Sequence, residues 1–249
     1  MKTVGIIGCG AIGSLIAKAI DCKLVICDLL VVYDQQRNRA LLLKKQLQVP
    51  VEVANSVDEL LERRPTVVVE AASQQAVKEY LNHLLSKGVD VIVMSTGALI
   101  DMGVSNPRVH VPSGAVGGLD AIRSAALAGI RSVTLQSKKN PRALDMSNTA
   151  PQVVYEGVAE EAVKLYPREM NVAATLALTV KPTPVKVQII SDPNVFRNTH
   201  EIYVEWTGGT MKLEFANDPH PENPRTSALA AWSAISLLKT LLDAKQEPR

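Results

Sequence analysis

The sequence predicts an α/β protein in which a doubly wound parallel sheet is followed by an α+β domain with a mixed or antiparallel sheet. Over the first 110 residues, short apolar runs alternate with stretches of helical periodicity, the pattern of strands buried on both faces of a parallel sheet. From about residue 111 on, apolar and polar residues alternate instead, as in strands with one solvated face. The 249 residues are enough for two domains.

Residues 1–110 are expected to form the first domain. Each expected strand but the last is followed by an expected helix or turn region, an order that specifies a parallel sheet. Ser56 is placed to cap one of the helices and Gly88 to end another. The expected strands are Thr3–Ile7, Leu24–Tyr33, Val51–Ala54, Thr66–Val69, Val89–Met94 and Val109–Val111, and the expected helices are Ala11–Ile20, Arg37–Gln48, Val57–Arg63 and Gln74–Lys87.

Residues 111–227 are expected to form the second domain. The pair Gly208-Gly209 between two alternating runs predicts a β-hairpin. A last helix, about residues 228–243, is apolar around much of its circumference, so we expect it to return and complete the first domain. The expected strands of the second domain are Ser132–Ser137, Val185–Ile190, Glu201–Trp206 and Thr210–Phe215, and its expected helices are Ala159–Leu165 and Asn171–Leu178.

Composition argues against two classes of partner. Lys plus Arg is 27 and Asp plus Glu is 25, whereas a nucleic-acid binder needs a dense basic patch. The sequence lacks an uncharged apolar run of the roughly 20 residues that span a bilayer, and its first residues do not have the form of a signal peptide. Cys9, Cys22 and Cys27 are an odd, clustered set without metal-ligand spacing. We therefore expect no membrane partner and no metal site, and a reducing, cytoplasmic location.

A glycine-rich segment, G-C-G-A-I-G, lies between the first expected strand and the first expected helix. Its first glycine permits a tight turn, its second lets a pyrophosphate approach the backbone, and its third lets the helix pack on the strand. The start of the helix adds N–H groups and the positive end of its dipole. This predicts a Rossmann-type dinucleotide site, and the residues expected to bind the cofactor here are Gly8, Gly10, Ala11, Ile12 and Gly13.

Asp34 ends the second expected strand, 21 residues after Gly13, where the ribose diol of a dinucleotide should lie. Its carboxylate favours NAD, because it would repel the 2′-phosphate of NADP. Arg37 is close enough in sequence to accept that phosphate instead, so NADP stays an alternative. We interpret Cys9, inside the glycine loop, as a small filler residue rather than a nucleophile.

Two further segments follow expected parallel strands at their carboxyl ends, where open sheets bind ligands. The first is Glu70–Ser73, which contains Ala72 and Ser73, and the second is Ser95–Ala98, which contains Ser95 and Thr96. We expect these residues to line the nicotinamide half of the cofactor site. The alternative is that Ser73 and Ser95 cap the helices behind them.

Hydride transfer needs a group that handles a proton beside the reacting carbon. Of the four histidines, His83 falls in an expected surface helix and His110 near a strand of the first domain. His220 lies in a loop between two prolines, and His200 lies where a loop meets a strand. The position of His200 favours it as the acid–base residue, with His220 as the alternative.

Several longer blocks resemble the L-aspartate dehydrogenase family. The resemblance implies the NAD(P)-dependent oxidative deamination of L-aspartate to iminoaspartate, or the reverse reductive amination, with a role in NAD biosynthesis and a homodimer. By position it implies a catalytic role for His200 and cofactor contacts at Ala115 and Asn171; the alternative for Asn171 is a helix N-cap. The blocks are the glycine loop, Glu70–Val77, Ser95–Ala98, Pro112–Asp120, Glu156–Gly157, Tyr166–Pro167, Asn171–Ala177 and Asn223–Ser227.

The segment Leu99–Arg108 is shorter than its counterpart in the family, which carries a helix there. We expect this crossover to be shortened or rebuilt, because parallel neighbours need a dozen or so linking residues. For the two substrate carboxylates, the candidates are a basic cluster of Lys138, Lys139 and Arg142, together with Arg225 and the N–H groups around Gly114–Gly118. The alternative for the cluster is a solvated charge run.

Two other functions stay open from the sequence. The first is another dehydrogenase or reductase with the same domain organisation, such as one related to homoserine dehydrogenase. The second is a non-catalytic sensor that binds NAD(H), although the sequence has no DNA-reading module to support it.

Overall fold

The computed structural model describes residues 2–220 and 223–244. The chain forms two compact units. The first contains the residues up to Pro112 and those from Ala231 on, and the second contains Ser113–Ala230.

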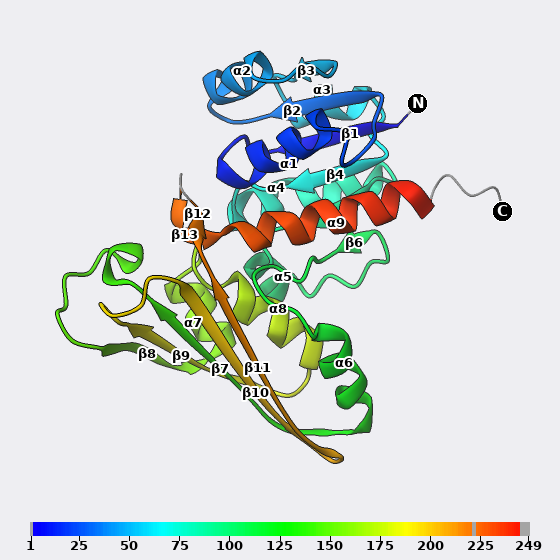
Figure 1. The fold of residues 1–249 in the computed structure, drawn as a ribbon. Coiled ribbons are helices and arrows are strands. Elements are labelled where there is room, and N and C mark those ends of the chain that lie inside the picture. Colours follow the sequence, from blue (N-terminus) through cyan, green and yellow to red (C-terminus); the bar gives the residue numbers. More distant parts are fainter. Residues whose placement is uncertain (1, 221–222, 245–249) are drawn as a thin grey trace. The chain divides into compact units, whose positions relative to one another are not determined.

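The first unit is built on a six-stranded sheet with the strand order β3-β2-β1-β4-β5-β6 (Figure 1). All neighbouring strands are parallel. This is the order of a doubly wound dinucleotide-binding sheet, which confirms the predicted fold class. The strands are β1 (Thr3–Ile7), β2 (Leu29–Tyr33), β3 (Val51–Val53), β4 (Val67–Glu70), β5 (Asp90–Val93) and β6 (Val109–His110).

Helices connect these strands, and the last helix of the chain joins them. In α9, the residues Ala234, Ile235, Leu238 and Leu242 are buried in the same apolar cluster as strand β1 and helix α1, so the C-terminal segment completes the core of this unit. The helices are α1 (Ala11–Asp21), α2 (Arg37–Lys45), α3 (Val57–Glu62), α4 (Gln74–Ser86), α5 (Gly97–Met102) and α9 (Ala228–Ala244).

Two elements of this unit differ from their expected form. Strand β2 begins at Leu29 rather than at Leu24, and the side chains of Leu24 and Ile26 are exposed. The crossover that we expected to be rebuilt contains the short helix α5, which ends at Gly103 with φ of 58°. Residues 94–108 thus supply a linker long enough for β5 and β6 to pair in parallel.

The second unit contains a five-stranded sheet with the order β11-β10-β7-β9-β8. Strands β7 and β9 are parallel, and the other neighbouring pairs are antiparallel, so the sheet is mixed, as predicted. A short two-stranded ladder joins β12 (Pro219–His220) to β13 (Asn223–Ser227). The five strands are β7 (Ile130–Lys139), β8 (Gln152–Val158), β9 (Val185–Ser191), β10 (Asn198–Trp206) and β11 (Gly209–Asn217).

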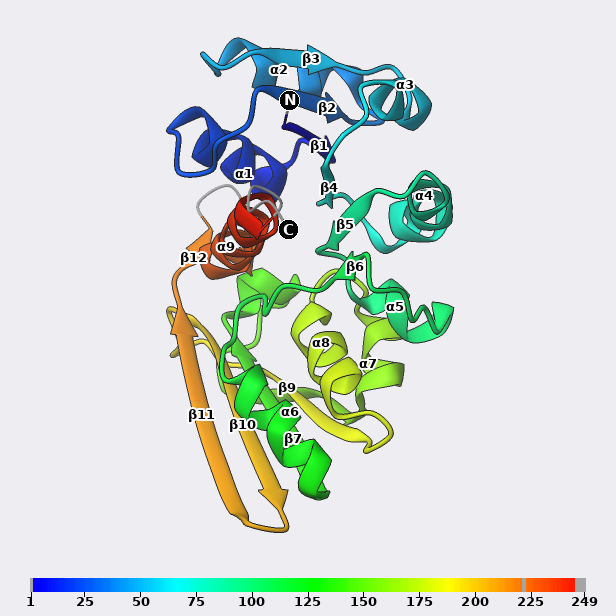
Figure 2. The same ribbon diagram turned by 90° about the vertical axis from the view of Figure 1, so that its right-hand side faces the viewer.

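Three helices cover one face of this sheet. Helix α6 (Leu119–Ala128) contacts β7 and β10, whereas α7 (Ala159–Leu165) and α8 (Asn171–Val180) contact β9 (Figure 2). The sequence did not predict α6, β8, β12 or β13. In β8, for example, Val153 is exposed and Val154 is only half-buried, so the strand lacks the clear alternation of its neighbours.

Within the described ranges, no helix combines the length and the apolar character needed to cross a membrane.

Candidate active site

The glycine loop brings β1 close to the start of α4 in the first unit. Gly8 has φ of 98°, and a Cβ atom there would lie 2.7 Å from the carbonyl oxygen of Ala71. A Cβ atom at Gly13 would collide with the carbonyl oxygen of Gly8. At Gly10, by contrast, a Cβ atom would meet none of the described atoms within 4 Å. The loop is therefore tight against the protein on one side and open at Gly10.

The N-terminus of α1 differs from those of α3 and α4, whereas α2 and α5 resemble it in lacking a side-chain cap. Ser56 Oγ accepts a hydrogen bond from the N–H of Glu59 in α3, and Ser73 Oγ accepts one from the N–H of Ala76 in α4. The N-cap of α1 is Gly10, and among the described residues no side chain caps this helix and no acid occupies its first turn. Uncapped N–H groups at the positive end of a helix dipole, beside open space, fit a pyrophosphate.

Asp34 follows β2 and is half-buried beside the glycine loop. Its Oδ2 accepts a hydrogen bond from the N–H of Cys9 at 2.8 Å, and its Oδ1 accepts one from the N–H of Gln36 at 2.8 Å. A carboxylate has about four acceptor positions, so these two bonds leave capacity for a ribose diol. Arg37 is exposed and interacts electrostatically with Glu59.

Cys9 is a buried thiol. Burial, followed by the nearby Asp34, raises its pKa to about 12. The side chain is therefore a protonated thiol at neutral pH, which agrees with the filler role predicted from the sequence.

Glu70, at the carboxyl end of β4, is a buried carboxyl group in the first of the two segments that we expected to line the nicotinamide half of the site. One oxygen accepts hydrogen bonds from the N–H groups of Ala72 (2.8 Å) and Ser73 (2.9 Å) and from the hydroxyl of Ser95 (3.0 Å). The other accepts one from the N–H of Ser95 at 3.0 Å. Burial raises the pKa of Glu70, although these bonds oppose the shift. Through these hydrogen bonds the Glu70 side chain connects the two loops that are expected to line the nicotinamide half of the site. Its sequence signal is an acid that ends an otherwise apolar strand.

The alternative prediction, that Ser73 and Ser95 cap the helices behind them, is correct for Ser73 and wrong for Ser95. The Ser73 hydroxyl caps α4, whereas the Ser95 hydroxyl donates to Glu70. The N-cap position of α5 falls on the buried Thr96.

His200 lies in β10, directly opposite Ser137 of β7. Only 4% of its surface is exposed. Its Nδ1 is 2.9 Å from Ser137 Oγ, so Nε2 is the ring nitrogen that this hydrogen bond leaves available to a substrate. Burial, followed by the positive charge of Lys139, lowers the pKa of His200 to about 3. The ring is thus neutral at physiological pH and can accept a proton.

The predicted basic cluster is divided by the sheet. Lys138 and Glu201 form an ion pair at 2.6 Å, on the face opposite the one that carries His200. Lys139 lies on the His200 face and is 2% exposed. Arg142 is exposed, and the side chain of Arg225 lies outside the described residues.

Ala115 and Asn171 also belong to the second unit. The carbonyl oxygen of Ala115 accepts a hydrogen bond from Asn217 Nδ2 at 2.9 Å, which holds the segment before α6 against the end of β11. Asn171 is the first residue of α8, with a buried carboxamide oxygen. The N-cap position falls on Met170, so the N-cap interpretation of Asn171 is wrong.

The other histidines have separate partners. His83 Nε2 lies 2.7 Å from Asp58 Oδ1, and His110 Nε2 lies 2.8 Å from Asp90 Oδ1. His220 falls in β12, but its side chain lies outside the described residues.

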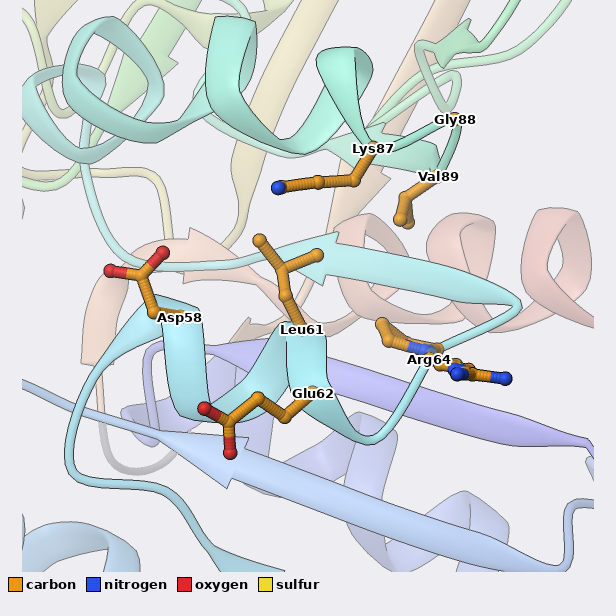
Figure 3. A pocket seen from close by; sticks show the side chains of 8 residues that line it. Asp58, Leu61, Glu62, Arg64, Lys87, Gly88 and Val89 are labelled. Atoms are coloured by element: carbon orange, nitrogen blue, oxygen red, sulfur yellow. The ribbon is translucent and has the colours of Figure 1, made fainter.

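A groove of the first unit lies at the other end of the strands from the glycine loop, and charged side chains, including Asp58, Glu62, Arg64 and Lys87, surround it (Figure 3). Its lining also includes Pro65 and Val89, which precede β4 and β5, so it lies at the amino ends of these strands. Ligands of doubly wound sheets bind at the carboxyl ends. The groove is therefore not the dinucleotide site.

Comparisons with known proteins found a matching family for each of the two units. Residues 120–241 match the family model described as "Aspartate dehydrogenase, C-terminal", and residues 8–107 match "Homoserine dehydrogenase, NAD binding domain". The L-aspartate dehydrogenase of Methanosarcina acetivorans is 39% identical, over 99% of each chain. That of Methanothermobacter thermautotrophicus is 40% identical, over 97% of this chain and 96% of its own.

A solved structure is similar over the full length as well. The aspartate dehydrogenase of Thermotoga maritima superposes with a TM-score of 0.74 at 30% identity, covering 100% of this chain and 99% of its own.

Proposed function

The chain belongs to the L-aspartate dehydrogenase family, and on that premise we propose that it interconverts L-aspartate and iminoaspartate with a nicotinamide cofactor. In the oxidative direction, L-aspartate and the oxidised cofactor give iminoaspartate, the reduced cofactor and a proton. The observation that carries the proposal is the neutral, buried His200, held by Ser137 beside the ammonium group of Lys139.

The residues of the first unit fit a dinucleotide, and NAD is the form that we propose. The uncapped N-terminus of α1 and the open space at Gly10 suit a pyrophosphate. The Asp34 carboxylate suits the ribose diol of NAD and repels a 2′-phosphate. Arg37 is exposed, and its charge also interacts with Glu59, so NADP is the weaker candidate. The bound nicotinamide supplies the acceptor for the hydride that leaves the substrate.

His200 is proposed as the catalytic base. The substrate amine must be neutral for hydride to leave, so its ammonium form has to lose a proton first. With Nδ1 hydrogen-bonded to Ser137, Nε2 takes that proton, or the proton of a water that attacks the imine. A pKa near 3 is too low for an efficient base, and a bound carboxylate would raise it by opposing the positive charge of Lys139.

The pathway role and the oligomeric state are proposed from the resemblance to the L-aspartate dehydrogenase family. The iminoaspartate product feeds NAD biosynthesis or hydrolyses to oxaloacetate and ammonia, and the enzyme acts as a homodimer. The cysteines are free thiols, which supports a cytoplasmic location. Size-exclusion chromatography with light scattering tests the homodimer.

The test of the function is the formation of NADH from L-aspartate and NAD, and its consumption with oxaloacetate and ammonia. We expect turnover in both directions and little with homoserine. His200→Ala should abolish most of the turnover while NADH affinity stays unchanged. Tight NADH binding without turnover of any dicarboxylate would instead identify a sensor, and turnover restricted to homoserine would identify the other dehydrogenase class.

A further inference from the structure

The loop before α6, residues 113–118, contains Ala115, for which the resemblance implies a cofactor contact. We call it the Ala115 loop. Gly114 and Gly118 have φ of 72° and 71°, a backbone conformation that glycine adopts at little cost. A loop with several glycines loses much conformational entropy when it is fixed, yet Ala115 and Val116 are buried. Contacts with the rest of the second unit must therefore hold the loop in place.

Strand β11, at the edge of the five-stranded sheet (Figure 2), provides such contacts through its side chains. A Cβ atom at Gly118 would collide with the side chain of Leu213. A Cβ atom at Gly117 would lie 3.5 Å from the ring of Phe215. The backbone of the Ala115 loop therefore lies directly against one face of β11.

Asn217 adds a directional contact on the same face of the strand. Its Nδ2 donates a hydrogen bond to the carbonyl oxygen of Ala115 at 2.9 Å, a good length for such a bond. Asn217 is two residues beyond Phe215, so the two side chains share a face. Apolar contacts let a backbone slide, whereas a hydrogen bond of this kind fixes the position of one carbonyl group. That group lies in the middle of the loop.

The strand that supports the loop is also the partner of the strand that carries the proposed base. Phe215 lies directly opposite His200, and Asn217 lies directly opposite Asn198. Residues directly opposite each other project from the same face of a sheet, so Phe215 and Asn217 share the face of the imidazole. A shift of the Ala115 loop along β11 would consequently be a shift relative to His200.

We propose that Asn217 is a positioning residue that keeps the Ala115 loop in register with His200. The inference rests on the proposed function, since it names a residue that holds the cofactor-contacting loop in place relative to the base. Asn217 acts through the backbone of Ala115. Small displacements of groups that orient the reactants are costly to the rate, so one hydrogen bond to this loop affects catalysis more than it affects folding.

The experiment compares Asn217→Asp with Glu214→Gln. The first variant keeps the shape of the side chain but replaces the donor by an oxygen, which repels the carbonyl group of Ala115. The second is an equally small change on the exposed face of the same strand. Fluorescence titration gives the dissociation constant of NADH, and calorimetry gives that of ADP-ribose, which lacks the nicotinamide ring. Urea unfolding shows whether each variant is folded.

We expect Asn217→Asp to raise the dissociation constant of NADH by at least about fivefold, the equivalent of one hydrogen bond. The dissociation constant of ADP-ribose should stay within about twofold, and kcat with L-aspartate should fall by at least about tenfold. Glu214→Gln should resemble the wild type in all three quantities. Loss of stability alone would not change the ratio of the two affinities in the folded protein, so this ratio separates positioning from a structural role.

Asn217→Ala covers the case in which Asn217→Asp does not fold, because it removes the donor without adding a charge. A folded Asn217 variant that keeps the wild-type ratio of NADH affinity to ADP-ribose affinity would overturn the inference, and so would a wild-type protein that does not bind NADH. The comparison of the two ligands needs no turnover. A changed ratio in the variant, together with a wild-type protein that does not oxidise L-aspartate, would therefore refute the proposed function alone.

Discussion

His200 and Ser137 face each other across the β10–β7 pair, with Nδ1 of the imidazole 2.9 Å from the serine hydroxyl. Both residues are buried, at 4% and 1% exposure. A hydrogen bond in such surroundings fixes the rotation of the ring and engages one of its nitrogens. The pair thereby leaves Nε2 as the ring nitrogen that we expect to face the substrate.

The first prediction concerns this hydrogen bond. Ser137→Ala leaves Nδ1 without its partner, so the ring loses its fixed orientation. We expect kcat with L-aspartate to fall by about ten- to hundredfold while the dissociation constant of NADH stays unchanged. Ser132→Ala is the control, because Ser132 lies on the opposite face of the same strand. Equal kinetics in the two variants would show that Ser137 does not position the base.

The second prediction concerns acid stability. The pKa of His200 is lowered to about 3 in the folded protein, mainly by burial, whereas in the unfolded chain it lies near 6.5. The unfolded state therefore binds more protons between these values, and the free energy of unfolding falls as the pH drops below about 6.5. From pH 7.5 to pH 5 the contribution of this residue is about 2 kcal/mol.

His200→Gln removes that contribution, so the pH dependence of urea unfolding should become shallower in the same interval. His83→Gln is the matched variant, since His83 is a partly exposed histidine. If wild type and His200→Gln lose stability in parallel from pH 7.5 to pH 5, the imidazole is not buried in its neutral form.

The third prediction concerns Glu70, whose carboxyl group accepts hydrogen bonds from two loops. Glu70→Gln keeps the shape but replaces one acceptor oxygen by an NH2 group, which would face a backbone N–H such as that of Ser95. We expect a loss of about 1–3 kcal/mol in the free energy of unfolding and weaker binding of NADH in fluorescence titrations. The exposed Glu62→Gln should change neither quantity, and full NADH affinity in Glu70→Gln would separate this residue from the cofactor site.

The repeating order of the first unit could be predicted from sequence because strands buried on both faces are continuous apolar runs, such as Val67–Val69. The start of β2 could not, because Leu24 and Ile26 extend an apolar run although both are exposed. Helix α5 was missed because it has only one turn and a half before Gly103. Short elements of this kind depend on their neighbours rather than on their own periodicity.

Two adjacent lysines of the second unit illustrate a second limit. Lys138 and Lys139 are equivalent as adjacent charges in the sequence, yet the two-residue repeat of a strand sends them to opposite faces. Which of them joins His200 depends on the register of β7 with β10, a long-range property. The hydrogen bonds of Glu70 could not be predicted for a related reason, since its donors come from two loops, one of them 25 residues away.

The fourth prediction concerns the choice of cofactor. Asp34→Asn removes the negative charge but keeps an oxygen that can accept from the N–H groups of Cys9 or Gln36. We expect the affinity for NAD to fall and the ratio of kcat/KM for NADP to that for NAD to rise by at least about tenfold, since the repulsion of a 2′-phosphate is lost. Asp28→Asn, an exposed acid near the start of β2, is the control. An unchanged ratio would mean that Asp34 does not face the ribose.

The fifth prediction separates two glycines of the same loop. A methyl group at Gly10 would meet open space, and φ of −80° there suits any residue, so Gly10→Ala should leave the free energy of unfolding within about 0.5 kcal/mol of the wild type. The same methyl would occupy the approach to the N-terminus of α1, and NADH binding should weaken by at least about tenfold. Gly13→Ala should instead destabilise the fold by about 1–3 kcal/mol, because its Cβ collides with the carbonyl oxygen of Gly8. Chemical denaturation and NADH titration of both variants check the contrast, and full NADH affinity in a stable Gly10→Ala protein would place the pyrophosphate elsewhere.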